Sequence, residues 1–239
     1  MPVVKVRQVS QFVAVIFVAA WAMLLGAPAP SASAQPCPDV EVVFARGTAE
    51  PPGVGGVGQA FVDTLRSQIG DRSLNVYPVN YEASSDFGAG IEFARTVVDG
   101  IRDAGGHIES TAANCPNTRI VLGGFSQGAV VSGYVTSAVI PPEIPAEFLS
   151  YIPQPMPPEI ADHVAAVVLF GKPSAEWMRQ IGAPPVVVGP LYAPKTLELC
   201  AADDTICNGA PAGPPSIAHA LYAVNGMVGE GASFAAGRL

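Results

Sequence analysis

Positively charged side chains are scarce in this sequence. Lys and Arg number 12 against 20 Asp and Glu, and charged residues make up only 13% of the 239 positions. Two of the cations, Lys5 and Arg7, lie near the amino terminus, so residues 35–239 carry 10 basic and 20 acidic side chains, a formal charge of −10. An acidic chain of this kind argues against nucleic acids and anionic membrane surfaces as partners.

Long apolar runs are also lacking, with one exception. Phe12–Leu25 is an apolar run of 14 residues, which is shorter than the roughly 20 residues that a bilayer span needs. It follows Lys5 and Arg7 and precedes Ala32-Ser33-Ala34, a small-residue cleavage pattern. We therefore predict a signal peptide over residues 1–34, and a mature, secreted protein over residues 35–239 with no integral membrane span. The remaining length suits one domain.

Cysteine is rare, and its pattern excludes one common use. The four cysteines form no Cys-x-x-Cys pair and have no nearby histidine, which argues against a zinc site. In an exported chain, four cysteines indicate two disulfides. Cys200 and Cys207 are close enough to close a small loop, and Cys37 and Cys115 each precede a predicted strand. If those strands are parallel neighbours, their entry ends meet, so the expected pairs are Cys37–Cys115 and Cys200–Cys207.

One stretch, from Arg119 to Val131, has the pattern of a nucleophile elbow. Aliphatic residues end at Gly123-Gly124, Ser126 follows, and Gly128 leads into an apolar helical run. Strand, sharp turn and helix hold a serine hydroxyl exposed and close to a base, and glycines leave room for that turn. The alternative is an ordinary strand-to-helix turn with a helix-capping serine, so the rest of the chain must decide.

Apolar runs of strand length alternate with helical patterns along the chain. We expect strands over 39–45, 73–79, from Arg119, over 163–171 and over 195–199. Helical patterns cover 59–69, 87–113 with an interruption at Gly105-Gly106, 130–140, a short piece at 177–181, and 216–227. The seven prolines of 141–158 predict an irregular surface connection. This alternation predicts an α/β fold, a three-layer, doubly wound sheet of about five parallel strands.

A glycine-rich match within 53–58 is discounted as a cofactor site. It has the spacing G-x-G-x-x-G, but a dinucleotide fingerprint begins at the end of a strand. Here eight residues, including Pro51 and Pro52, follow the first strand, and no acid ends the second strand. We expect a flexible loop at 53–58 and no metal or organic cofactor.

Only three histidines are available as a base for Ser126. His163 opens a buried strand at the opposite edge of the sheet, and His107 lies in a glycine-flanked bend. His219 follows the last strand on the side where Ser126 is expected. The orienting acid should fall between Ser126 and His219, just after a strand, where Asp203 and Asp204 both lie inside the predicted cystine loop. Spacing alone does not choose between them.

An oxyanion formed at Ser126 needs two hydrogen-bond donors. One is the backbone N–H of Gln127, and the second is expected from the glycine-relaxed loop Gly47-Thr48, where Thr48 adds a hydroxyl. Arg46 is interpreted as a buried cation that bonds loop carbonyls. Candidate contacts for an acyl chain are apolar side chains near the site: Ile217, Leu221 and Phe87.

Together these elements resemble the cutinase family of secreted serine esterases, in its actinobacterial branch. The matching motifs span nearly all of the mature chain: Ala45-Arg46-Gly47-Thr48, Gly124-Phe125-Ser126-Gln127-Gly128, Cys200-x-x-x-Asp204-x-x-Cys207 and His219-Ala220-Leu221-Tyr222. The resemblance implies Asp204 as the acid, an oxyanion hole from Thr48 and Gln127, and a small α/β-hydrolase without a large lid. Lys172 departs from the acidic residue that family members often carry there.

The resemblance implies a carboxylic-ester hydrolase that uses Ser126, His219 and Asp204 and forms an acyl-enzyme. The expected substrates are small-molecule or lipid esters with short to medium acyl chains, and the expected state is a monomer. Two alternatives remain open. One is a catalytically silent secreted or cell-wall-associated binding protein with the same fold, and the other is an acyltransferase or thioesterase with the same triad.

Overall fold

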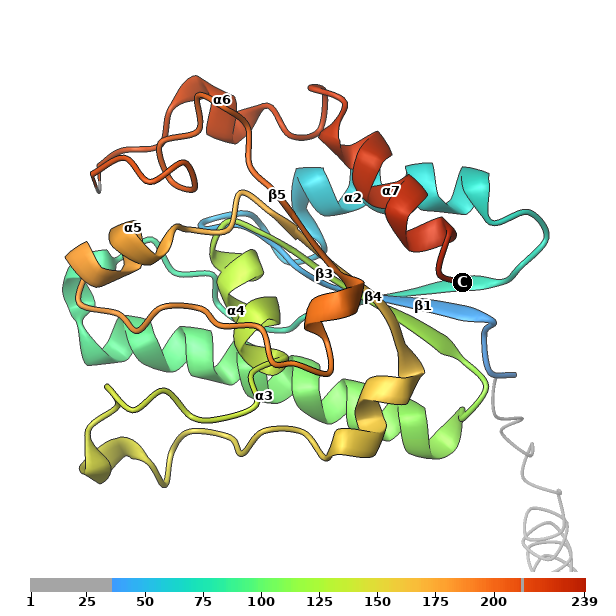
Figure 1. The fold of residues 1–239 in the computed structure, drawn as a ribbon, viewed down its shortest axis with the longest axis horizontal. Coiled ribbons are helices and arrows are strands. Elements are labelled where there is room, and N and C mark those ends of the chain that lie inside the picture. Colours follow the sequence, from blue (N-terminus) through green and yellow to red (C-terminus); the bar gives the residue numbers. More distant parts are fainter. Residues whose placement is uncertain (1–35, 212) are drawn as a thin grey trace, which may run out of the picture. The chain divides into compact units, whose positions relative to one another are not determined.

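A parallel sheet of five strands forms the centre of the structure, in the order β2-β1-β3-β4-β5 (Figure 1). The computed structural model describes residues 36–211 and 213–239, so the predicted leader over 1–34 lies outside the described residues. All neighbouring strands pair in parallel. Their bounds are β1 Val40–Ala45, β2 Leu74–Pro78, β3 Arg119–Phe125, β4 Val164–Phe170 and β5 Thr196–Leu199. The predicted strands are confirmed to within a few residues at each end.

Helices cover both faces of the sheet. The helices are α2 Gly55–Gln68, α3 Ile91–Asn114, α4 Gln127–Val135, α5 Ala175–Gln180, α6 Ile217–Ala220 and α7 Met227–Ala236. In Figure 1, α2 and α7 lie on one side of the strands, and α3 and α4 lie on the other. The predicted three-layer, doubly wound α/β architecture is therefore confirmed.

The core is divided by the sheet, as the two-residue period of a strand requires. Val40, Val42 and Phe44 of β1 belong to the cluster shared with α2 and α7. Val43 and Ala45 belong to the cluster shared with α3 and α4. Because helices cover both faces, β1 and β4 are buried at every position, which explains their nearly continuous apolar sequence.

The predicted interruption of the second helix is wrong. Helix α3 runs unbroken through Gly105 and Gly106 for 24 residues. Each helical glycine costs about 1 kcal/mol relative to alanine. Burial of the stripe Val98, Ala104, Ile108 and Ala112 against the sheet outweighs this local cost, because helices in proteins are stabilised mainly by such packing.

His107 consequently lies on a regular helix and not in a bend. Its Nε2 is 3.0 Å from Oε2 of Glu41, a carboxylate that is only 4% exposed. Glu41 also accepts hydrogen bonds from Thr111 Oγ1 and Asn75 Nδ2, both at 2.8 Å. Burial acts to raise the pKa of Glu41, but these hydrogen bonds outweigh it and lower the pKa. His107 therefore takes part in a structural cluster.

Three other boundaries differ from the predictions. Residues 55–58, expected as loop, form the first turn of α2. Helix α4 ends at Val135, where Thr136 caps it by donating its hydroxyl to Gly133 O, and so does not reach residue 140. The helix expected over 216–227 is instead one short turn, α6, followed after Gly226 by α7. The proline-rich segment 141–158 contains no α-helix or strand, as predicted.

Candidate active site

Ser126 stands on the sharp turn between β3 and α4. Its backbone has φ 54° and ψ −117°, a left-handed conformation that is uncommon for a residue with a Cβ. The turn is held by the Ser126 N–H, which donates to Phe170 O at 2.9 Å. A Cβ on Gly124 would overlap the backbone of Gly128, and a Cβ on Gly128 would overlap the backbone of Ala45, so both positions require glycine. The Ser126 side chain makes no capping bond to α4, so the helix-cap alternative is wrong.

Ser126, His219 and Asp204 form one chain of hydrogen bonds. Ser126 Oγ lies 2.8 Å from His219 Nε2, and His219 Nδ1 lies 2.8 Å from Asp204 Oδ2. An ionised carboxylate can only accept, so the geometry fits a proton on Nδ1 and leaves Nε2 to accept from the serine hydroxyl. Asp204 is fully buried and His219 is 7% exposed. Asp203, the rival acid, is exposed and does not reach this chain.

Three donors surround the buried carboxylate of Asp204. Burial acts to raise its pKa, but hydrogen bonds from His219, the Ile206 N–H and the Tyr222 hydroxyl outweigh it and lower the pKa. The Ile206 N–H reaches Oδ1 at 2.9 Å, and Tyr222 Oη donates to Oδ2 at 2.8 Å. Burial raises the pKa of Tyr222, which keeps it a neutral donor. Asp204 is therefore held as a carboxylate at neutral pH.

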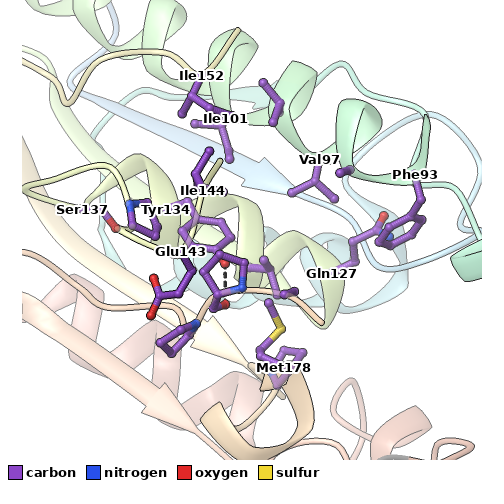
Figure 2. Close-up of a pocket in the computed structure, with 18 of the residues that line it drawn as sticks. Phe93, Val97, Ile101, Gln127, Tyr134, Ser137, Glu143, Ile144, Ile152 and Met178 are labelled. Atoms are coloured by element: carbon purple, nitrogen blue, oxygen red, sulfur yellow. Dashed lines mark hydrogen bonds between the residues drawn. The ribbon is translucent and has the colours of Figure 1, made fainter. Parts of the chain in front are cut away.

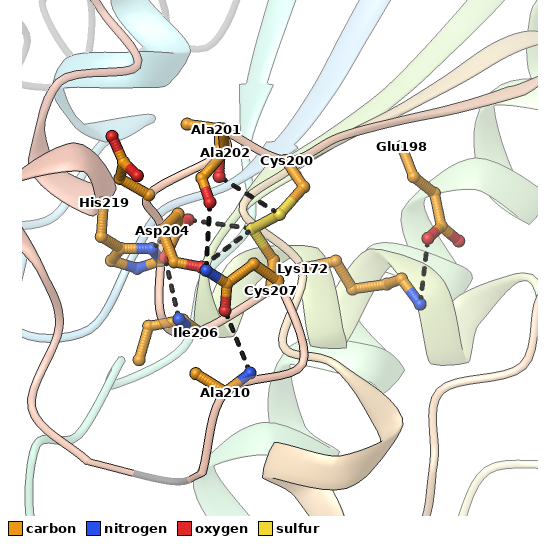
Figure 3. Close-up of a disulfide and its surroundings, with 12 residues drawn as sticks. Lys172, Glu198, Cys200, Ala201, Ala202, Asp204, Ile206, Cys207, Ala210 and His219 are labelled. Atoms are coloured by element: carbon orange, nitrogen blue, oxygen red, sulfur yellow. Dashed lines mark hydrogen bonds and ion pairs between the residues drawn. A yellow bond between two sulfur atoms is a disulfide. The ribbon is translucent and has the colours of Figure 1, made fainter.

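The small cystine loop holds Asp204 in place (Figure 3). Cys200 and Cys207 are bonded, as are Cys37 and Cys115, so both predicted disulfides are present. Within the loop, the Asp204 N–H donates to Ala201 O at 2.9 Å, and Cys207 Sγ lies 3.1 Å from Asp204 Oδ2. Lys172, beside the loop, forms an ion pair with Glu198 of β5 at 3.2 Å.

The loop after β1 brings Thr48 to the same edge of the sheet as Ser126. Arg46 fixes this loop from beneath, because its guanidinium donates to Glu50 O at 2.8 Å, Tyr81 O at 2.5 Å and Glu82 O at 3.1 Å. Arg46 is 4% exposed, so its interpretation as a buried cation that bonds loop carbonyls is confirmed. Gln127 begins α4, and its side-chain Nε2 donates to Ser84 O at 3.1 Å.

A large apolar groove opens beside these residues. Thr48, Ser126, Gln127 and His219 border a cavity of about 2000 Å³. Figure 2 shows its walls: side chains from α3, α4, α5 and the proline-rich segment face one space, among them Phe93, Val97, Ile101, Tyr134, Ile144, Ile152 and Met178.

The candidate acyl contacts divide between the groove and the outside. Phe87 lines the groove, whereas Ile217 and Leu221 do not. Helix α6 is a single turn that directs His219 inward, so Ile217 and Leu221 point outward and are 80% and 43% exposed. The expectation that these two residues line the groove is therefore wrong.

The described residues offer little to a metal or a membrane. Residues 36–211 and 213–239 contain no group of three or more His, Cys, Asp or Glu side chains placed to hold a metal ion. Among the same residues, we find no helix with the length and apolarity needed to cross a bilayer.

Comparison with known proteins gives the family. A family model described as Cutinase matches residues 36–239. The chain belongs to the cutinase family.

Relatives and a solved structure agree with this membership. The chain is 62% identical over 173 residues to "Probable carboxylesterase Culp7" of Mycobacterium tuberculosis (strain ATCC 25618 / H37Rv), covering 72% of this chain and 89% of that protein. It is 45% identical over 233 residues to "Phospholipase Culp4" of the same organism, covering 98% and 92%. A solved structure, Trichoderma reesei cutinase in complex with a C11Y4 phosphonate inhibitor, matches with TM-score 0.58 and 30% identity, covering 91% and 83%.

Sequence reasoning missed two features of this cutinase-family site. Tyr222 was noted only as part of a motif, yet its hydroxyl bonds Asp204 and also accepts from the Ala201 N–H at 3.0 Å. An aromatic residue three positions after the candidate base was the available signal. The groove was missed because its walls come from distant segments, although the wide apolar face of α3 was visible in the sequence.

Proposed function

We propose that this cutinase-family protein is a secreted serine carboxylesterase, in which Ser126, His219 and Asp204 form the catalytic triad. The observation that carries the proposal is the chain of two 2.8 Å contacts from Ser126 Oγ through His219 to Asp204 Oδ2. Such a chain activates a hydroxyl that is otherwise a weak nucleophile. Relatives named as a carboxylesterase and a phospholipase support the reaction class.

In the proposed mechanism, Ser126 Oγ attacks the acyl carbonyl while His219 Nε2 takes its proton. Asp204 holds the imidazole in the required tautomer and stabilises the imidazolium. The Gln127 N–H and the Thr48 hydroxyl donate to the oxyanion, which lowers the energy of the tetrahedral intermediate. His219 then returns the proton to the leaving alcohol, and the acyl-enzyme remains. Water, deprotonated by His219, attacks this ester and releases the acid and free Ser126.

The proposed substrates are uncharged acyl esters, with short and medium acyl chains entering the groove from the Ser126 end. The apolar walls of the groove favour hydrocarbon over charged groups. Two disulfides, which persist in oxidising compartments, support secretion together with the predicted leader. We propose a monomer as the active form.

Steady-state hydrolysis of p-nitrophenyl esters tests the function against a silent binding protein. We expect saturable release of p-nitrophenol by the mature chain, with acetate or butyrate among the substrates. A binding protein would show no saturable rate at any chain length. An acyltransferase or thioesterase would be recognised by product analysis, since added alcohols or thioesters would then be preferred over water and oxygen esters.

The two disulfides are expected to differ in their effect on activity. Replacing Cys200 and Cys207 with serine should lower the unfolding free energy by about 2–3 kcal/mol and also lower kcat, because Asp204 lies inside the opened loop. Replacing Cys37 and Cys115 removes a longer loop, worth about 4–5 kcal/mol, but should leave kcat near that of the wild type at a temperature where both variants are folded. Urea unfolding and ester hydrolysis measure the two effects. An equal loss of kcat in both variants would contradict the positioning role of the cystine loop.

A further inference from the structure

The groove continues far beyond the triad, along one face of α3. Residues of α3 that line it recur every three or four positions, which places them on a single stripe: Ile91, Ala94, Val98, Ile101, Gly105 and Glu109. Helix α3 follows β2, so it starts near the carboxyl edge of the sheet, where Ser126 lies, and runs back toward the opposite edge (Figure 1). The groove therefore leads away from Ser126 into the body of the protein.

The strap, residues 139–157, forms the opposite wall of this groove. Ile144 and Ile152 of the strap face the same space as Ile101 and Tyr134 (Figure 2). Tyr151 attaches the strap to α3, because Arg102 Nη2 donates to Tyr151 O at 2.7 Å. The guanidinium groups of Arg95 and Arg102 also lie 5.4 and 5.1 Å from the Tyr151 ring centre. The strap is thus fastened along the helix and keeps the groove open.

The length of the groove matches a long hydrocarbon chain. Val97 packs with Val130, which is one turn of α4 beyond Ser126, so these residues mark the catalytic end. From Val97 to Gly105 the helix advances about 12 Å. One lipid acyl chain occupies half of the roughly 30 Å hydrocarbon core of a bilayer, or about 15 Å. A long chain held at Ser126 would therefore reach Gly105, whereas a butyryl chain would end near Val97.

The volume of the groove also exceeds the need of a small ester. Pockets for small molecules typically enclose about 300–1000 Å³, and this groove encloses about 2000 Å³. Its apolar side chains remain partly exposed: Phe87 is 49% exposed, Ile91 45% and Phe148 36%. Apolar surface of this extent, continuous with a catalytic serine, is typical of a site for an apolar ligand.

Gly105 marks the point where a side chain would block the groove. A Cβ built on Gly105 would lie 4.0 Å from Met156 Cγ of the strap and touch nothing closer. Alanine would therefore fit there at an ordinary contact distance. An aromatic ring at the same position would extend toward Met156 and close the space between helix and strap.

We propose that the groove between α3 and the strap binds the acyl chain of a long-chain fatty ester, and that the missing side chain at Gly105 admits the chain's far end. This proposal rests on the proposed function, since the carbonyl is held at Ser126. The substrate class is thus an ester of a long-chain fatty acid, in addition to the shorter esters that occupy only the catalytic end.

A chain-length series with blocking variants tests the proposal. We compare kcat/KM for p-nitrophenyl butyrate, laurate and palmitate, all in the same detergent. Gly105→Phe should lose palmitate hydrolysis by at least about tenfold and keep butyrate hydrolysis, since each methylene in an apolar pocket changes the rate by roughly 10-fold or more. Ile101→Trp blocks the groove one turn closer to Ser126, so it should lose laurate as well as palmitate. Butyrate hydrolysis also reports that each variant is folded.

Two variants serve as controls. Gly105→Ala adds only a methyl group, and Ala113→Phe adds the same ring on an exposed position of α3 outside the groove. Both should keep the wild-type chain-length profile. Titration of palmitate into Ser126→Ala, with and without Gly105→Phe, measures occupancy without turnover, and the blocked protein should bind more weakly.

The outcomes separate the two proposals. Lack of butyrate hydrolysis by the wild type would overturn the proposed function, while the palmitate titration would still decide the role of the groove. Equal palmitate kcat/KM and equal palmitate binding with glycine or phenylalanine at position 105 would overturn the groove proposal and leave the esterase intact.

Discussion

Replacing Ser126 with alanine is expected to lower kcat for ester hydrolysis on the order of 10⁶-fold, the scale seen when a triad nucleophile is removed. The loss is large because no other hydroxyl stands 2.8 Å from His219 Nε2 among the described residues. Binding of the ester should change little, since the groove walls remain intact. Steady-state kinetics with p-nitrophenyl butyrate measures the effect.

The matched control for this variant is Ser67→Ala. Ser67 lies exposed on α2, on the other side of the sheet, and its hydroxyl donates only to Thr64 O. Its removal should leave kcat and KM at wild-type values. If Ser126→Ala retained a kcat close to that of Ser67→Ala, the assignment of the nucleophile would be wrong.

Replacing Asp204 with asparagine is expected to lower kcat by about 10⁴-fold, because an amide at this position favours the wrong tautomer of His219. Asp203→Asn is the control, since Asp203 is the adjacent carboxylate in the same cystine loop but is exposed to solvent. It should hydrolyse esters at the wild-type rate. Comparable losses in the two variants would contradict the assignment of Asp204.

The same pair of variants tests the ionisation of Asp204. Its pKa is lowered in the folded protein, so its ionisation contributes stability that is present above the unfolded value near 3.9. That stability is lost as the pH falls through the lowered folded pKa. Asp204→Asn should therefore be less stable than the wild type at neutral pH in urea unfolding, and the difference should narrow in acid. A difference independent of pH would show that the carboxylate charge contributes no stability.

Much of the fold could be predicted because burial on both faces leaves a clear record in a strand. The runs that became β1 and β4 are apolar at nearly every position, as parallel strands beneath helices require. Helix boundaries were harder, because local propensity competes with packing. Gly105-Gly106 favours a break, yet α3 continues through it because its buried stripe packs on the sheet.

The residues of the candidate site could be named because the chemistry restricts them to few positions. Only three histidines exist, and only His219 follows the last strand. Spacing left Asp203 and Asp204 equal, because adjacent residues of a loop point in different directions that only the folded cystine loop fixes. The groove could not be predicted, since it depends on how the strap lies against α3. The outward direction of Ile217 and Leu221 likewise follows from the single turn of α6.

Covalent labelling of the mature protein with a fluorophosphonate probe tests the proposed nucleophile most directly. A serine activated by His219 attacks phosphorus and keeps the adduct, which peptide mass spectrometry can locate. We expect one adduct per chain, on Ser126, with hydrolysis of p-nitrophenyl butyrate lost in proportion to labelling, and no adduct on Ser126→Ala. Equal labelling of the wild type and Ser126→Ala would contradict the proposed mechanism.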